Sequence, residues 1–264
     1  MGCGAIKGHL DIVRLLLDRG AQIDAKDNMG ATALLLAINK PHVEIVRLLL
    51  DRGAGKEIAD SKGRTPLFMA ALDNSSSVTK RISKLEIVQL LLQYGALLNA
   101  KSQRTGETAL HAAASTRDGN LVEFLIDNGA TIDVGFRYST NAVVIVVDKS
   151  RRDIAQLLLD KGAAISIGNH TIKSNGTTLL EIAAQKDNLD IDMAKFLLDR
   201  RASIDTDRVA LLLEDAVYKC KIDMVRFLLD LGIDVDVNIS QPFLKRYKKG
   251  RMLYTLQLLP ADVS

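Results

Sequence analysis

The chain has 264 residues, of which 47% are hydrophobic but only 4% aromatic, with no Trp. So few rings favour thin layers of Leu and Ala over a single globular core. The formal net charge of +3 is small for this length and does not by itself indicate nucleic-acid binding. Cys3 and Cys220, the only cysteines, exclude a disulfide framework. We expect an intracellular chain, cytoplasmic or nuclear, without a membrane-spanning segment or secretory signal.

One stretch recurs along the whole chain. It reads IVRLLLDRGA at residues 12–21 and again at 45–54, and looser copies begin at Ile87, Leu121, Ile154, Met193 and Met224. The base period is about 33 residues, which indicates stacked repeats. The repeats close at these positions: Gly20, Gly53, Gly95, Gly129, Gly162, Arg201 and Gly232.

The first copy predicts a helix over residues 10–19. Its apolar positions cover more than one stripe, so this helix must pack against a partner helix and against neighbouring repeats. Gly20 stands at the helix end, where the left-handed conformation suits Gly.

A shorter helix is predicted upstream of each such helix. It appears as GATALLLA at 30–37, GRTPLFMA at 63–70, GETALHAA at 106–113 and GTTLLEIA at 176–183. Each stretch offers Thr as the N-cap, and Pro66 follows its Thr at a position where a missing N–H costs nothing. The small Ala37, Ala70, Ala113 and Ala183 allow the paired helices to approach closely.

These stretches resemble the ankyrin-repeat signature, in which a short T-P-L-H-x-A helix precedes a longer G-H-L-E-I-V-K-L-L-L helix and a G-A-D-V-N-A hairpin. Residues 8–17 (GHLDIVRLLL) and 20–25 (GAQIDA) follow it closely. The resemblance implies an all-α ankyrin-repeat solenoid of about seven repeats, with stacked helix-turn-helix units joined by β-hairpin-like loops. We expect this domain over residues 1–257, including a partial C-terminal repeat, and a tail over 258–264.

Several segments depart from the signature. Residues 142–147 have strand propensity, but the flanking copies predict a helix there. Residues 74–82 (NSSSVTKRI) are expected to form a mobile surface loop. Counting back from Thr32 predicts that the first short helix lacks most of its length, so the chain is expected to be a piece of a longer array or one with covered ends.

Catalysis is not expected. GAGKE at 53–57 matches only the tail of a phosphate-binding loop, and Leu50 and Glu57 break that motif. The four histidines do not converge, and the resemblance implies a structural hydrogen-bonding role for His111. No nucleophile with a base can be assembled. We therefore expect no metal and no cofactor.

The resemblance implies partner binding along a concave groove lined by hairpin tips and short helices. Arg and aromatic side chains are the types that most often dominate interfaces. Of the tip residues, Phe136 is equally consistent with packing into the fifth repeat. The candidate partner-binding residues are Lys26, Met29, Lys62, Arg64, Arg104, Phe136, Arg137 and Tyr138.

We expect the partner to be another protein of unknown identity and do not expect nucleic acid. The chain would act as a monomer or as part of a longer protein. Two roles stay open: an independent scaffold or adaptor, and the substrate-recognition segment of a larger machine, such as a ubiquitin-ligase receptor or a channel's cytosolic domain. Residues 258–264 (LLPADVS) resemble the opening of an F-box-like motif at the ends of some viral ankyrin proteins. The basic run at 245–251 is either a solvated loop or a binding or import signal.

Replacing Phe136, Arg137 and Tyr138 together by Ala tests the two interpretations of this hairpin. If the rings bind a partner, the triple variant loses partner capture in a pull-down while its helical circular dichroism and melting temperature stay unchanged. A collapsed melting transition would instead assign the rings to the fold.

Overall fold

The computed structural model of the chain describes residues 1–72, 77–134, 141–164, 179–185, 191–200, 213, 216–217 and 221–230. Within these residues the structure contains helices and turns and no strand, so the prediction of an all-α repeat solenoid is confirmed. The helices are α1 (Gly2–Lys7), α2 (Leu10–Asp18), α3 (Ala33–Asn39), α4 (Val43–Asp51), α5 (Pro66–Ala71), α6 (Val78–Gln93), α7 (Ala109–Ala114), α8 (Gly119–Asp127), α9 (Ala142–Asp148), α10 (Arg152–Asp160), α11 (Leu179–Gln185), α12 (Ile191–Asp199) and α14 (Ile222–Asp230).

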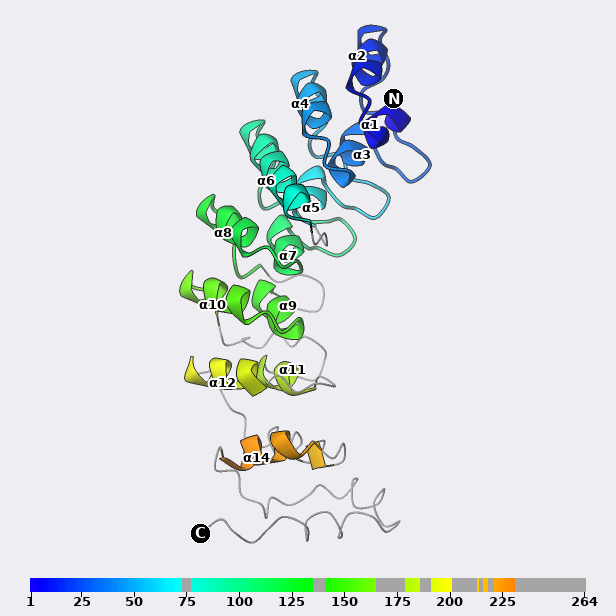
Figure 1. Ribbon diagram of the computed structural model, residues 1–264. Coiled ribbons are helices and arrows are strands. Elements are labelled where there is room, and N and C mark those ends of the chain that lie inside the picture. The colour runs from blue at the N-terminus through cyan, green and yellow to red at the C-terminus, as the bar shows by residue number, and fades with distance from the viewer. Residues whose placement is uncertain are drawn as a thin grey trace, which may run out of the picture.

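The helices form two rows (Figure 1). The short helices α1, α3, α5, α7, α9 and α11 make an inner row, and α2, α4, α6, α8, α10 and α12 make an outer row. Each inner helix packs against its outer partner and against the inner helices before and after it. The loops between successive repeats project beyond the inner row, as Figure 1 shows.

The inner helices begin at the predicted caps. The Thr32 hydroxyl accepts a hydrogen bond from the Leu35 N–H at 3.4 Å, and the Thr65 hydroxyl accepts one from the Phe68 N–H at 3.3 Å. In α7 the cap is reciprocal, because His111 Nδ1 accepts the Thr108 backbone N–H at 3.2 Å. Such caps satisfy backbone donors that have no partner inside the helix. This geometry agrees with the structural role expected for His111.

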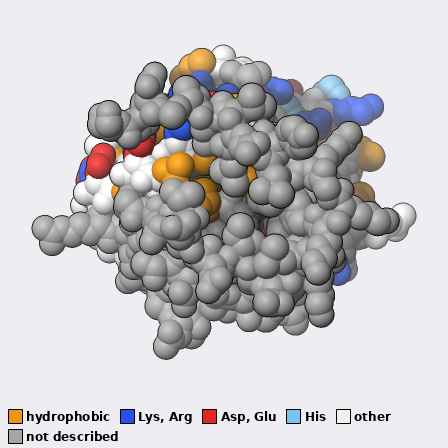
Figure 2. Space-filling view, turned by 90° about the horizontal axis from the view of Figure 1, so that it is seen from below, with side chains coloured by type: hydrophobic (Ala, Val, Ile, Leu, Met, Phe, Trp, Pro, Cys, Tyr) orange, Lys and Arg blue, Asp and Glu red, His pale blue; other side chains and the backbone are white. Residues whose placement is uncertain are grey.

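The core runs along the stack between the two rows. Ala37, Ala70, Ala113 and Ala183 are completely buried, so the paired helices do approach closely at these positions. Ile45 of α4 is 2% exposed, whereas the equivalent Ile12 of α2, at the N-terminal end of the stack, is 50% exposed. Viewed from the other end, hydrophobic side chains of described residues are visible near the centre, and basic and His side chains gather at one margin (Figure 2).

The strand propensity of residues 142–147 conflicts with the helix that the repeat register predicts there. In the structure residues 142–148 form α9, and the side chain of its N-cap Asn141 accepts the Val144 N–H at 3.1 Å. Four of its five valine and isoleucine side chains are buried. The repeat register therefore prevails over the β-propensity of Val, as predicted.

Two expectations about segment length were wrong. α6 begins at Val78 and runs for 16 residues, so most of the predicted surface loop at 74–82 is helical; residues 73–76 lie outside the described residues. The buried Lys84 ammonium donates to the Met69 carbonyl of α5 at 3.1 Å and ties this longer helix to its partner. α1 is not missing most of its length either, because it has 6 residues, as α5 and α7 do.

Glycines with positive φ act at two kinds of place. Gly20 closes α2 at φ 80°, and a Cβ there would meet nothing within 4 Å. Gly30 lies in a hairpin at φ 72°, and a Cβ there would stand 2.8 Å from the backbone nitrogen of Ser61 in the next hairpin. Gly30 thus allows two hairpins to stack.

Replacing Gly30 by Ala should destabilise the protein more than replacing Gly20 by Ala. Both variants carry the cost of a left-handed Ala, about 1 to 2 kcal/mol. The Gly30→Ala variant also has to displace the Ser61 backbone, which adds about 1 to 3 kcal/mol of overpacking. Urea unfolding followed by circular dichroism measures the difference, and equal midpoints for the two variants would contradict the stacking contact.

Candidate functional site

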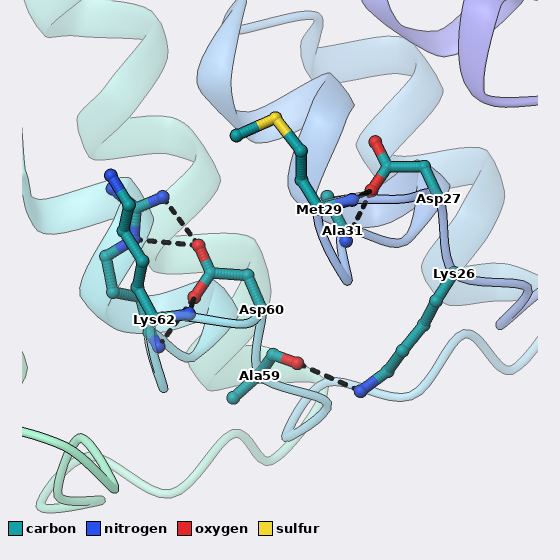
Figure 3. A network of polar contacts seen from close by, with 8 residues as sticks. Lys26, Asp27, Met29, Ala31, Ala59, Asp60 and Lys62 are labelled. Atoms are coloured by element: carbon teal, nitrogen blue, oxygen red, sulfur yellow. Dashed lines mark hydrogen bonds and ion pairs between the residues drawn. The ribbon is translucent and has the colours of Figure 1, made fainter.

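The first two hairpins are built on matching aspartates (Figure 3). Asp27 Oδ1 accepts the N–H groups of Met29 and Ala31, both at 2.8 Å. One period later, Asp60 Oδ1 accepts the N–H groups of Lys62 and Arg64, both at 2.9 Å. Asp side chains stabilise tight turns in this way. These two carboxylates therefore hold the tips in shape.

Arg64 also belongs to this turn. Its Nε donates to Asp60 Oδ2 at 2.8 Å, and one of its terminal nitrogens contacts the same oxygen. Burial alone would raise the pKa of the Asp60 carboxyl, but the hydrogen bonds and charge of Arg64, with the Lys62 N–H, lower it below its usual value. Arg64 was predicted to bind a partner, but its guanidinium is engaged within its own hairpin.

Successive hairpins are joined to one another. The Lys26 ammonium donates to the Ala59 carbonyl at 3.1 Å, as Figure 3 shows. The Ser61 N–H donates to the Met29 carbonyl at 3.2 Å, and the Gln103 N–H donates to the Gly63 carbonyl at 3.3 Å. The three tips therefore form one continuous edge, which we call the hairpin row (residues 26–31, 59–64 and 101–107).

The third tip has a different turn. Ser102 stands where the earlier hairpins have Asp, and this turn has one residue more. The Ser102 N–H donates to the Glu107 carbonyl, and the Gly106 N–H donates to the Ser102 carbonyl, both at 2.8 Å. The Thr105 hydroxyl donates to the Glu107 carboxylate at 2.9 Å. The first two tips have the same two kinds of backbone bond, so the third tip keeps the backbone bonds and lacks those of the Asp side chain.

The structure brings together most of the candidate residues in the hairpin row. Met29 is 65% exposed, and its side chain stands away from the bonded turns in Figure 3. Lys26, Lys62 and Arg104 are exposed as well. Phe136, Arg137 and Tyr138 lie outside the described residues, as do Arg201, the basic run at 245–251 and the tail at 258–264.

The inner helices, which were expected to line the binding surface, contribute partly exposed apolar side chains that the sequence analysis did not single out. We call these side chains the apolar floor. Leu36 of α3, Ile145 of α9 and Ile182 of α11 are partly exposed and occupy the same position of the repeat. The Leu36 side chain lies beside α1, because a Cβ on Gly2 would stand 3.0 Å from its Cδ1, and it stays partly exposed there. The repeat period was the available signal, because the equivalent Met69 and Ala112 are also apolar.

A second ladder joins the turns that follow the outer helices. Each acceptor lies four residues after a closing glycine, and each donor is a backbone N–H of the next repeat. The bonds run from the Gly55, Leu97, Thr131 and Ala164 N–H groups to Asp24 (2.9 Å), Glu57 (2.8 Å), Asn99 (2.9 Å) and Asp133 (3.2 Å). Gly55 and Glu57 of GAGKE are part of this ladder, which explains that stretch without a phosphate.

The ends of the outer helices carry exposed polar links. Arg52 pairs with Asp18 at 2.8 Å, Lys161 with Asp127 at 2.6 Å, and Arg200 with Asp160 at 2.7 Å, and the Tyr94 hydroxyl donates to Asp51. Gln93 and Asn128 occupy the corresponding positions between α6 and α8, where no such link forms among the described residues. Exposed pairs of this kind contribute about 0 to 1 kcal/mol each.

Arg151 occupies the turn position where the second repeat has His42. His42 Nε2 lies 3.2 Å from the Ile6 carbonyl of the preceding repeat. Two nitrogens of the Arg151 guanidinium, Nε and Nη1, are buried without a hydrogen-bond partner in the described part of the chain. Burial, and then the charge of Arg117, lower the pKa of Arg151. Arg151 is thus a costly substitute for a packing histidine.

The described residues show no metal-binding cluster. Within them, no three His, Cys, Asp or Glu side chains form a group that could hold a metal ion. His42 and His111 both serve packing or capping at separate repeats. What the described surface offers is a rigid edge with an apolar floor beside it.

The family model for ankyrin repeats matches residues 2–83 and 76–169. The chain is 30% identical over 118 residues to the ankyrin repeat protein FPV031 of Fowlpox virus, covering 43% of this chain and 34% of that protein. It is 29% identical over 127 residues to the E3 ubiquitin-protein ligase KEG of Arabidopsis thaliana, covering 46% of this chain and 8% of the ligase. The chain thus spans about a third or less of these relatives.

Replacing Asp60 by Asn should destabilise the protein by about 1 kcal/mol more at neutral pH than replacing Asp27 by Asn. Both Asn variants keep an acceptor for the turn, but only Asp60→Asn loses the ion pair with Arg64. Urea unfolding of both variants and the wild type measures this gap.

The same pair of variants predicts a pH dependence. The pKa of Asp60 is lower in the folded state than the unfolded value of about 3.9, so its charge stabilises the fold above that pH. The stabilisation disappears as the pH falls through the folded pKa. The gap between the two variants should therefore close in acid, and a gap independent of pH would contradict the ion pair.

Proposed function

Because this chain belongs to the ankyrin-repeat family, we propose that it is a scaffold or adaptor that binds another protein along its hairpin row and inner helices. Ankyrin repeats generally mediate protein–protein interaction and are typically not enzymes. The partner's identity is left open, and nucleic acid is not part of the proposal.

One observation carries the proposal. Bonds between hairpins fix the hairpin row before any partner arrives, while Met29 stays 65% exposed at its edge. A surface that is already ordered loses little conformational entropy on binding. Met is also a side chain that is enriched at interfaces. The partner-binding candidates are Lys26, Met29, Lys62, Arg64, Arg104, Phe136, Arg137 and Tyr138, of which Lys26 and Arg64 also make bonds within the hairpin row.

A second candidate function is the substrate-recognition segment of a larger machine. It is favoured by the similarity to part of an E3 ubiquitin-protein ligase, of which this chain covers 8%. The same surface would then select a substrate for a catalytic part elsewhere. Substrates captured in cells would carry ubiquitin in a manner that depends on this chain, whereas a simple adaptor predicts no such dependence.

We propose an intracellular location and a monomer or a part of a longer protein as the working form. The intracellular expectation comes from the use of only two, widely separated cysteines. Separately, none of the helices in the described residues is long and apolar enough to cross a membrane.

Binding along the inner row is tested by a matched pair of substitutions to the uncharged residue Gln. Ile145→Gln changes the apolar floor, and Leu15→Gln changes an outer-row side chain that is already 53% exposed. We expect Ile145→Gln to lose partners recovered by affinity purification and mass spectrometry, and Leu15→Gln to retain them. Circular dichroism confirms that both variants fold, and equal recovery by both would contradict binding along the inner row.

A further inference from the structure

The acidic and basic side chains of the hairpin row differ in how many of them make bonds within the protein. Its three tips contain five basic and three acidic side chains. Each acidic side chain has work within its own turn: Asp27 accepts two backbone N–H groups, Asp60 accepts two more and pairs with Arg64, and Glu107 accepts from Thr105. The carboxylates of the hairpin row are thus occupied by hydrogen bonds and an ion pair within their own turns.

Three of the basic side chains make no such bonds. Lys62, Lys101 and Arg104 are exposed, and their side chains make no hydrogen bond or ion pair in the described part of the chain. Met29, Lys62 and Arg104 follow one another on neighbouring tips, because Ser61 bonds to Met29 and Gln103 bonds to Gly63. The row therefore presents one apolar and then several cationic side chains in a fixed order.

The floor beside this row has a different character. Leu36, Ile145 and Ile182 are partly exposed apolar side chains at one repeat position, whereas the equivalent Met69 and Ala112, which lie between them in the series, are buried. A segment lying along the inner helices would meet apolar side chains on one face and cations at the hairpin edge. Complementary charge selects and orients such a partner.

We propose that the partner segment is an acidic amphipathic stretch of protein, with apolar side chains on the inner helices and carboxylates facing Lys62, Lys101 and Arg104. This proposal rests on the proposed function and specifies the chemistry of the partner. The apolar floor distinguishes it from a nucleic-acid site, where base stacking on aromatic side chains would be expected. The three tips of the hairpin row carry no aromatic residue, and Phe136 and Tyr138 of the following tip lie outside the described residues.

The test is selection of short random peptides on phage against the wild-type chain and a Lys62→Glu/Arg104→Glu double variant. The control is Lys40→Glu/Lys149→Glu, which makes the same charge change at exposed turns between paired helices. Wild type and control should enrich peptides in which Asp or Glu accompany Leu, Ile, Val or Phe. The double variant should bind those peptides about tenfold more weakly and lose the acidic preference.

The outcomes separate the two proposals. If the enriched peptides lose binding to the Ile145→Gln variant but are not rich in Asp or Glu, the proposed partner chemistry is overturned and binding along the inner row still stands. If the enriched peptides bind the Ile145→Gln variant and the double variant as tightly as the wild type, the proposed function itself is overturned. A single-stranded oligonucleotide that binds the wild type and is lost in the double variant would overturn the assignment to a protein segment. Binding of the enriched peptides should also weaken as salt rises, because exposed charges are screened.

Discussion

No single repeat of this chain can bury its own apolar surface, and the structure depends on that constraint. Inner helices of six or seven residues are too short to be stable alone in water. They persist because each packs on an outer helix and on the inner helices of its neighbours. Completely buried alanines set the spacing between the rows. Stability is therefore shared between neighbours, as in other stacked repeats.

Polar bonds follow the same period as the core. On one side, Asp27 and Asp60 shape the tips, and backbone bonds join tip to tip. On the other side, Asp24, Glu57, Asn99 and Asp133 each accept a backbone N–H of the next repeat. Three different residue types fill that one role. What is repeated is a side-chain acceptor at a fixed place, which links each of these turns to the next repeat.

The sequence predicted the features that recur. Thr caps, closing glycines and the α9 register all follow from the period, which outweighed the strand propensity of Val. The helical conformation of residues 78–82 was not predicted because the serines at 75–77 just before them indicated a loop. In the structure these residues belong to α6, which Lys84 docks on α5. Arg64 was chosen as a binding residue by type alone. Its ion pair with Asp60, four residues earlier, could have been suspected, but only coordinates show the guanidinium engaged.

The missing polar link between Gln93 and Asn128 has a mechanical consequence. α6 and α8 also make few contacts with each other, whereas the inner helices α5 and α7 pack extensively. This junction is thus fastened mainly along its inner row and by the bonds of Asn99 at the adjoining turn. Bending at this junction would therefore pivot about α5 and α7, which hold the third and fourth layers together while α6 and α8 move relative to each other.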